Sequence, residues 1–223
     1  MLAAAGGAWA ALGLRPRRAW ASTVRGTLTL PADLRAARRH FGYWRVENGN
    51  VPVQSAPFHA QTLVLLEGFR GPAPAARTVT VEISGLAANP TLVVLGPGSV
   101  LELRNLDRVA HDLGIADKPG LMAVERLAAN AMRRQRFLEP GGYLVRCSEY
   151  PHIAISAVVV ASPFYAVADA QGGFKLPDVP DGKGTLRVWS AGRWVHDEPV
   201  EVSSRGADLS VRVTGGAARE PSE

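Results

Sequence analysis

Residues 140–147 read Pro-Gly-Gly-Tyr-Leu-Val-Arg-Cys, a turn that leads directly into a strand. Tyr143, Val145 and Cys147 share one face of this strand, because successive side chains point to opposite sides. The opposite face carries Arg146, so the cysteine face is predicted to be the inner one. The stretch therefore predicts a sheet strand that delivers a cysteine to the core side.

The same pattern of short apolar or alternating runs continues on both sides of this stretch. The 23 glycines and 16 prolines are spread along the chain between these runs, which favours many strands and turns over long helices. Strands are predicted at 24–30, 62–66, 79–83, 92–95, 101–104, 143–147, 157–161, 165–168, 174–176, 185–189, 200–202 and 209–213. This spacing predicts an all-β fold of sandwich architecture.

Two stretches favour other structures. Residues 32–40 (ADLRAARRH) are expected to form a short basic helix. Residues 123–137 are rich in Ala, Leu, Met and Arg, and we expect a loop with a helical turn followed by a strand. The Pro/Ala segment 71–76 (GPAPAA) is the best candidate for a boundary between domains.

The N-terminal 21 residues differ in composition from the rest of the chain. They contain an apolar stretch, three arginines, no acidic residue and the small residues Ala19 and Ala21, which fit a secretory signal with cleavage before Ser22. The arginines follow the apolar stretch, so an upstream start codon or a frayed tail are the alternatives. The formal net charge is +5, and without the three arginines it is +2, which does not call for a nucleic-acid partner. No run reaches the ~18 apolar residues of a membrane-spanning helix. We expect a periplasmic or otherwise exported protein.

Cys147 is the only cysteine of the 223 residues, so no intramolecular disulfide can form. The common protease, hydrolase and nucleotide-binding motifs are missing, and we expect no enzyme. The remaining candidates are His111, Cys147 and His152, because a thiolate with two imidazoles is a ligand set that copper prefers. The alternative for the cysteine is a small buried core residue, and for the histidines an exposed loop.

A family resemblance rests on three pieces of the middle of the chain. Residues 98–105 (GSVLELRN) form a turn and a strand, and Asp107 and His111 follow. Residues 137–147 carry the pattern F-x-x-P-G-x-Y-x-x-x-C. In these features residues 79–160 resemble a cupredoxin, the plastocyanin-like blue copper fold.

The wider chain resembles exported bacterial proteins of plastocyanin-like or methylamine-utilisation-like type, in which a carboxypeptidase-regulatory-like (prealbumin-type) sandwich accompanies the cupredoxin. Residues 26–31, 64–68, 164–180 and 185–189 carry this likeness. The resemblance implies a Greek-key cupredoxin domain at 77–161, inserted into a regulatory-like β-sandwich built from 22–70 and 162–214. Residues 215–223 are expected to be a polar tail.

The ligand loop departs from the resembled group, which typically reads Cys-x-x-His-Pro-x-Met. Tyr150 stands at the histidine position and Ile153 at the methionine position, and no methionine follows Cys147. Two interpretations stay open. In the first, His152 replaces the second imidazole, as in azurin-like and phytocyanin-like loops with Cys-x4-His spacing, and the axial position is empty or filled by a backbone oxygen.

In the second interpretation, the site has decayed and the domain is a metal-free binding or structural module of the cell envelope. The first interpretation implies one type 1-like copper ion, held by His111, Cys147 and His152, and single-electron transfer to a redox partner protein.

Overall fold

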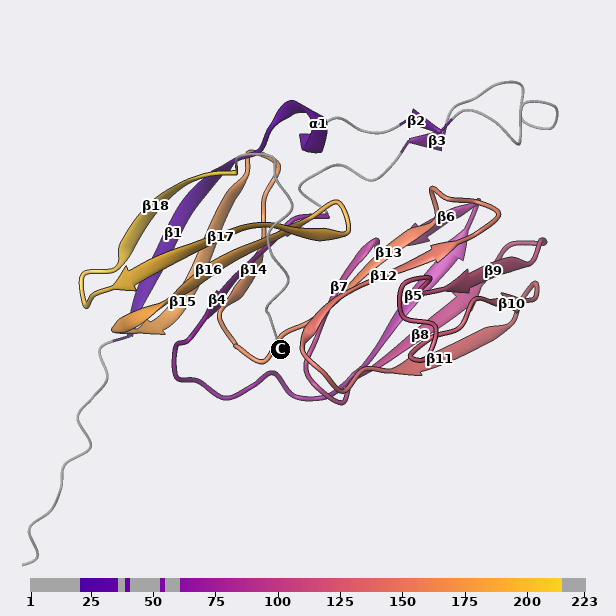
Figure 1. The fold of residues 1–223 in the computed structure, drawn as a ribbon, viewed down its shortest axis with the longest axis horizontal. Helices are drawn as coiled ribbons and strands as arrows, with labels where there is room; N and C mark the ends of the chain where they lie inside the picture. The colour runs from indigo at the N-terminus through magenta and orange to yellow at the C-terminus, as the bar shows by residue number, and fades with distance from the viewer. Residues whose placement is uncertain (1–20, 36–38, 41–52, 55–60, 214–223) are drawn as a thin grey trace, which may run out of the picture.

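The computed structural model describes residues 21–35, 39–40, 53–54 and 61–213, and nearly all of its regular structure is β-strand. The all-β fold class predicted from the sequence is confirmed. Two sandwiches lie side by side, the first on the left and the second on the right of Figure 1. The signal-like segment 1–21, except for Ala21, and the tail 215–223 lie outside the described residues. In the described part of the chain, no helix has the length and apolar character needed to cross a membrane.

The first sandwich, here called the terminal sandwich, takes strands from both ends of the described chain. One sheet has the order β15 (Gly173–Pro180), β1 (Ala21–Thr29), β18 (Ala207–Arg212), and the other β14 (Tyr165–Val167), β4 (Leu63–Glu67), β16 (Gly182–Ser190), β17 (Arg193–Val202). Strand β1 pairs antiparallel with β15 and parallel with β18, so the first strand lies between two of the last. The two sheets enclose one apolar core that contains Val24, Leu66, Leu176, Leu186 and Val188.

The second sandwich, the middle sandwich, is formed by the strands in between. Its larger sheet has the order β10 (Glu125–Leu127), β9 (His111–Gly114), β12 (Gly141–Cys147), β13 (Ala154–Val159), β7 (Leu92–Leu95), and its smaller sheet β11 (Met132–Arg136), β8 (Val100–Asn105), β5 (Thr78–Ser84), β6 (Ala87–Asn89). Both sheets mix parallel with antiparallel pairs, because β5 runs parallel to β8 and β13 parallel to β7. The strand order therefore needs crossovers from one sheet to the other.

The alternation in β12 follows the sequence prediction. Tyr143, Val145 and Cys147 are buried, and Arg146 is exposed. The three buried side chains belong to the core of the middle sandwich, which also contains Leu101, Leu103, Ile115 and Phe137 from other elements. Burial of this apolar face holds β12 in register, because a slip of one residue would turn every side chain to the other side.

Two sequence predictions need correction. Of the helix expected over 32–40, Ala32–Arg35 form α1, residues 36–38 lie outside the described residues, and Arg39–His40 form strand β2, which pairs with β3 (Val53–Gln54). In 123–137, strand β10 lies where a helical turn was expected, and it pairs with β9. The strand expected after it is present as β11, which pairs with β8. In both places strand pairing overrides the helix propensity of Ala, Leu and Arg.

A separate apolar cluster joins the two sandwiches. It consists of Leu63, Leu65, Leu92, Val158, Val160 and Trp189, with Val94, Tyr165 and Trp194 packed against it. Trp189 belongs to β16 of the terminal sandwich, and its ring lies so close to Gly142 of β12 that a β-carbon there would overlap the ring. The strand that ends in Cys147 is thus packed against the terminal sandwich near its beginning.

The outer face of the smaller middle sheet holds one buried acid. Glu102 is only 2% exposed, and its carboxylate accepts bonds from Arg104 Nε at 2.7 Å and from Arg134 Nη2 at 2.6 Å. The arginines themselves extend into solvent. The hydrogen bond from Arg134 has the largest effect on the pKa of Glu102, and the one from Arg104 adds to it. Together they hold this pKa below its ordinary value of 4.5.

The fit between Gly142 and Trp189 can be tested with Gly142→Ala. The added methyl group must displace the tryptophan ring, and we expect the free energy of unfolding to fall by about 1–3 kcal/mol. Gly120→Ala is the matched control, since a β-carbon there meets no atom within 4 Å. Urea unfolding of both variants measures the difference. If both variants lost the same free energy of unfolding, the close packing of the Trp189 ring on Gly142 would not contribute to stability.

The Glu102 cluster predicts a pH dependence of stability. Because its pKa is lowered in the folded chain, the ionised carboxylate stabilises the fold above pH 4.5, and this contribution is lost as the pH falls through the folded-state pKa. Glu102→Gln should therefore destabilise the protein at about pH 7 and lose this effect in strong acid. Denaturant unfolding across pH, with the exposed Glu82→Gln as control, checks the sign. A pH-independent difference would contradict it.

Candidate metal centre

The register of two neighbouring strands brings His111 and Cys147 to one face of a sheet. Cys147 of β12 pairs with Leu113 of β9, and His111 stands two residues before Leu113 on the same side of its strand. His111 is therefore the diagonal neighbour of Cys147, a relation that places Cα atoms roughly 7–8 Å apart. Both side chains are buried, at 0% and 1% exposure. His111 is the first residue of β9 and fully buried, so it does not lie in an exposed loop.

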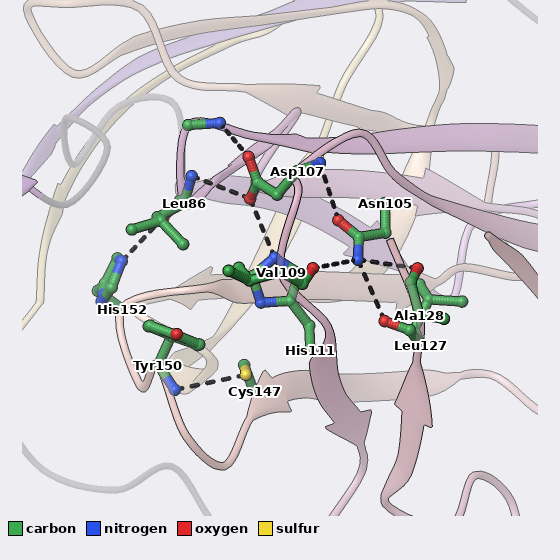
Figure 2. A network of polar contacts seen from close by, with 11 residues as sticks. Leu86, Asn105, Asp107, Val109, His111, Leu127, Ala128, Cys147, Tyr150 and His152 are labelled. Carbon is green, nitrogen blue, oxygen red and sulfur yellow. Dashed lines mark hydrogen bonds and ion pairs between the residues drawn. The ribbon is translucent and has the colours of Figure 1, made fainter. Parts of the chain in front are cut away.

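The imidazole of His111 is held by Asp107. Its Nε2 lies 2.9 Å from Asp107 Oδ2. An ionised carboxylate only accepts hydrogen bonds, so Nε2 donates to Asp107, and in the neutral form of the ring Nδ1 is the nitrogen with the lone pair. That Nδ1 is buried and has no hydrogen-bond partner. In Figure 2 it is on the side of the ring that faces Tyr150 and Cys147.

The Asp107 carboxylate also clamps the turn between β5 and β6. Its Oδ1 accepts the Gly85 N–H at 2.6 Å, and its Oδ2 accepts the Leu86 N–H at 3.1 Å. The backbone N–H of Asp107 in turn donates to Asn105 Oδ1 at 3.0 Å. Asn105 is fully buried, and its amide nitrogen lies within hydrogen-bonding distance of the carbonyls of Val109, Leu127 and Ala128. The loop that precedes His111 is thus fixed by polar contacts of Asn105 and Asp107 (Figure 2).

Cys147 begins a tight loop that folds back onto its own sulfur. The Tyr150 N–H donates to Cys147 Sγ at 3.4 Å, and the Ile153 N–H donates to the Tyr150 carbonyl at 2.8 Å. The Cys147 N–H donates to the Ile153 carbonyl at 3.0 Å, which closes the loop. Ile153 is fully buried and aliphatic, so it offers no axial donor.

His152, the third predicted ligand, hydrogen-bonds to the backbone of Leu86. Its Nε2 lies 2.8 Å from the Leu86 carbonyl oxygen, and because a carbonyl only accepts, Nε2 donates. The side chain is half-buried. Between the two histidines lies Tyr150, whose ring centroid is 5.4 Å from that of His111 and 6.4 Å from that of His152, edge-on to both. The three predicted ligands thus fall into a His111–Cys147 pair and a separate His152.

The donor set of the pair fits a copper ion. A thiol sulfur and an imidazole lone pair are the soft and borderline donors that copper takes, and a carboxylate behind the far ring nitrogen is the usual way to orient a metal-ligating histidine. The third position is less complete. Within the described ranges, no three His, Cys, Asp or Glu side chains gather closely enough to hold a metal ion. The assignment of all three ligands remains a prediction.

Sequence reasoning missed the part played by the Gly85–Leu86 turn. Leu86 contributes only its backbone N–H and carbonyl, and a peptide group leaves no residue-specific signal in a sequence. The φ of Leu86 is 61°, in the left-handed region, which is costly for a leucine. In this conformation the Leu86 backbone hydrogen-bonds to both Asp107 and His152. Asp107 was visible in the sequence, but not its role.

Searches of known proteins found solved structures with a similar fold. The chain is similar to a copper-containing nitrite reductase from Thermus scotoductus (23% identity, 44% of this chain and 25% of that chain, TM-score 0.34). It is also similar to amicyanin from Paracoccus versutus (18% identity, 44% and 97%, TM-score 0.34) and to a purple cupredoxin from Nitrosopumilus maritimus (19% identity, 36% and 98%, TM-score 0.32).

The chain spans a quarter of the nitrite reductase, and TM-scores of this size carry no argument about function. No family model and no curated protein matches the sequence.

The role of Asp107 can be tested with Asp107→Asn. An amide replaces one accepting oxygen by an NH2 group, so at least one of the N–H groups of Gly85, Leu86 and His111 would face another donor. We expect the free energy of unfolding to fall by about 1–3 kcal/mol. If the amide NH2 faces His111, nitrogen NMR of the imidazole should also show that the Nε2–H form of His111 is lost. The exposed Asp117→Asn is the control, and an equal effect of both variants would refute the clamp.

Proposed function

We propose that this chain is an exported copper-binding protein of the type 1 (blue) copper class that carries single electrons, with His111, Cys147 and His152 as ligands. The observation that supports it most is the buried Nδ1 of His111, which has no hydrogen-bond partner although its ring is fixed. Leaving a buried polar atom unsatisfied costs about 1–3 kcal/mol. A metal ion at the lone pair would remove that cost.

The neighbouring residues support the same assignment. Cys147 supplies the sulfur on the face that His111 shares, and the Tyr150 N–H points at that sulfur and would stabilise a thiolate. Asp107 keeps the His111 proton on Nε2, so that Nδ1 stays available. His152 would complete the ligand set by giving up its bond to the Leu86 carbonyl. It belongs to the short loop 148–153 that directly follows Cys147.

Copper in such a site supplies reversible one-electron oxidation and reduction. One electron would enter from a reduced one-electron donor protein and leave to an oxidised acceptor protein, and no covalent bond forms or breaks. The protein would thus act as a carrier and not as an enzyme. We further propose that residues 77–161 form the copper domain, and that 22–70 with 162–214 form a regulatory-like domain of the same exported protein.

A second candidate is a metal-free module of the cell envelope. The observation that favours it is the environment of the sulfur, which lies in an apolar cluster with Leu113, Met122 and Tyr150. In this case Cys147 is a small core residue, and His111 keeps its bond to Asp107 for structural reasons only.

Copper titration of the full chain distinguishes the two candidates. We expect one equivalent of Cu(II) to give an intense visible thiolate-to-copper band, because a Cys147 thiolate is bonded to the metal. Cys147→Ala and His111→Ala should abolish the band, and His152→Ala should weaken or shift it.

His196→Ala is the matched control, because this imidazole pairs with Glu198 in the terminal sandwich, 3.0 Å away. The proposal fails if copper is retained equally by the Cys147 and His111 variants. A wild-type chain that retains neither Cu(I) nor Cu(II) supports the metal-free module.

A further inference from the structure

One aromatic ring separates the His111–Cys147 pair from His152. Tyr150 is only 7% exposed, and its ring packs edge-on against both imidazoles, at centroid distances of 5.4 and 6.4 Å. The Tyr150 backbone N–H donates to the Cys147 sulfur, which fixes the residue next to the His111–Cys147 pair. Its side chain lies between the two histidines. Figure 2 shows His111 and His152 on opposite sides of this ring.

The position of His152 is fixed from its other side as well. Its Nε2 donates to the Leu86 carbonyl, and the Leu86 N–H donates to the same Asp107 oxygen that accepts from His111. The backbone N–H and carbonyl of one residue, Leu86, therefore connect the two histidines by way of Asp107. His152 can approach the pair only if the Tyr150 ring moves and the bond to Leu86 breaks.

The two oxidation states of copper need these residues to different degrees. Cu(I) is soft and suits a thiolate with few further donors, whereas Cu(II) prefers several imidazole nitrogens. We infer that Tyr150 is a specificity-determining positioning residue. Cu(I) needs only the His111–Cys147 pair, whereas Cu(II) also recruits His152, which must first displace the Tyr150 ring and leave the Leu86 carbonyl, so the site favours Cu(I) over Cu(II). This inference rests on the proposed copper site and states which oxidation state that site favours.

The inference assigns the tyrosine ring a steric role and not a ligand role. A phenol is protonated near neutral pH and is a poor donor to copper in that form. Tyr150→Phe keeps the ring and removes the hydroxyl, so it separates the two roles. Tyr150→His replaces the ring by an imidazole at a position whose backbone already contacts the Cys147 sulfur.

The test measures the affinity of the full chain for Cu(I) and for Cu(II) by competition with chelators specific for each ion. The wild type and Tyr150→Phe should show the same preference for Cu(I). Tyr150→His should raise the affinity for Cu(II) relative to Cu(I) by about tenfold or more, since even an outer-sphere partner changes metal affinity by roughly 10–100-fold. It should also strengthen the visible thiolate-to-copper band. His196→Ala again serves as control.

His152→Ala keeps the test decisive if Tyr150→His fails to fold. In the wild-type background it should leave Cu(I) affinity within about threefold and lower Cu(II) affinity by about tenfold or more. The inference is overturned if Tyr150→Phe abolishes Cu(I) binding, if Tyr150→His leaves the ratio of the two affinities unchanged, or if His152→Ala weakens both ions equally. Retention of both ions by His111→Ala and Cys147→Ala would instead overturn the proposed site itself.

Discussion

The Asp107 carboxylate is the group on which the arrangement of the site depends. It accepts hydrogen bonds from Gly85, Leu86 and His111, which come from two separate parts of the middle sandwich. Because an ionised carboxylate only accepts, each of these groups must donate to it. This requirement fixes the proton of His111 on Nε2 and leaves Nδ1 as the nitrogen that faces the cysteine.

Ordinary core packing places these polar groups. Leu113 and Val145 are fully buried in the core of the middle sandwich, and their burial sets the register between β9 and β12. A shift of one residue would put His111 and Cys147 on opposite faces of the sheet. The apolar side chains thus decide where the sulfur and the imidazole lie, although they take no part in their chemistry. Packing of Gly142 against Trp189 extends this support to the terminal sandwich.

Much of the fold could be predicted from the alternation of side chains. Strands with a clear two-residue period, such as β5 and β12, lie where the sequence places them. The short strands β6, β9 and β10 could not be predicted, because they show neither a two-residue period nor an apolar run, unlike the equally short β7. Their backbone hydrogen bonds decide their conformation, which local composition does not record.

The sequence by itself determined the chemical inventory of the site: one thiol at residue 147, a histidine at 111 and another at 152, a tyrosine at 150, and no methionine after the cysteine. It also determined that Cys147 faces inward, because the period of a strand is a local property. Only the tertiary structure decided which nitrogen of His111 faces the sulfur and that His152 bonds to Leu86, 66 residues away. Those choices depend on donors and acceptors that meet through folding, so no local pattern could encode them.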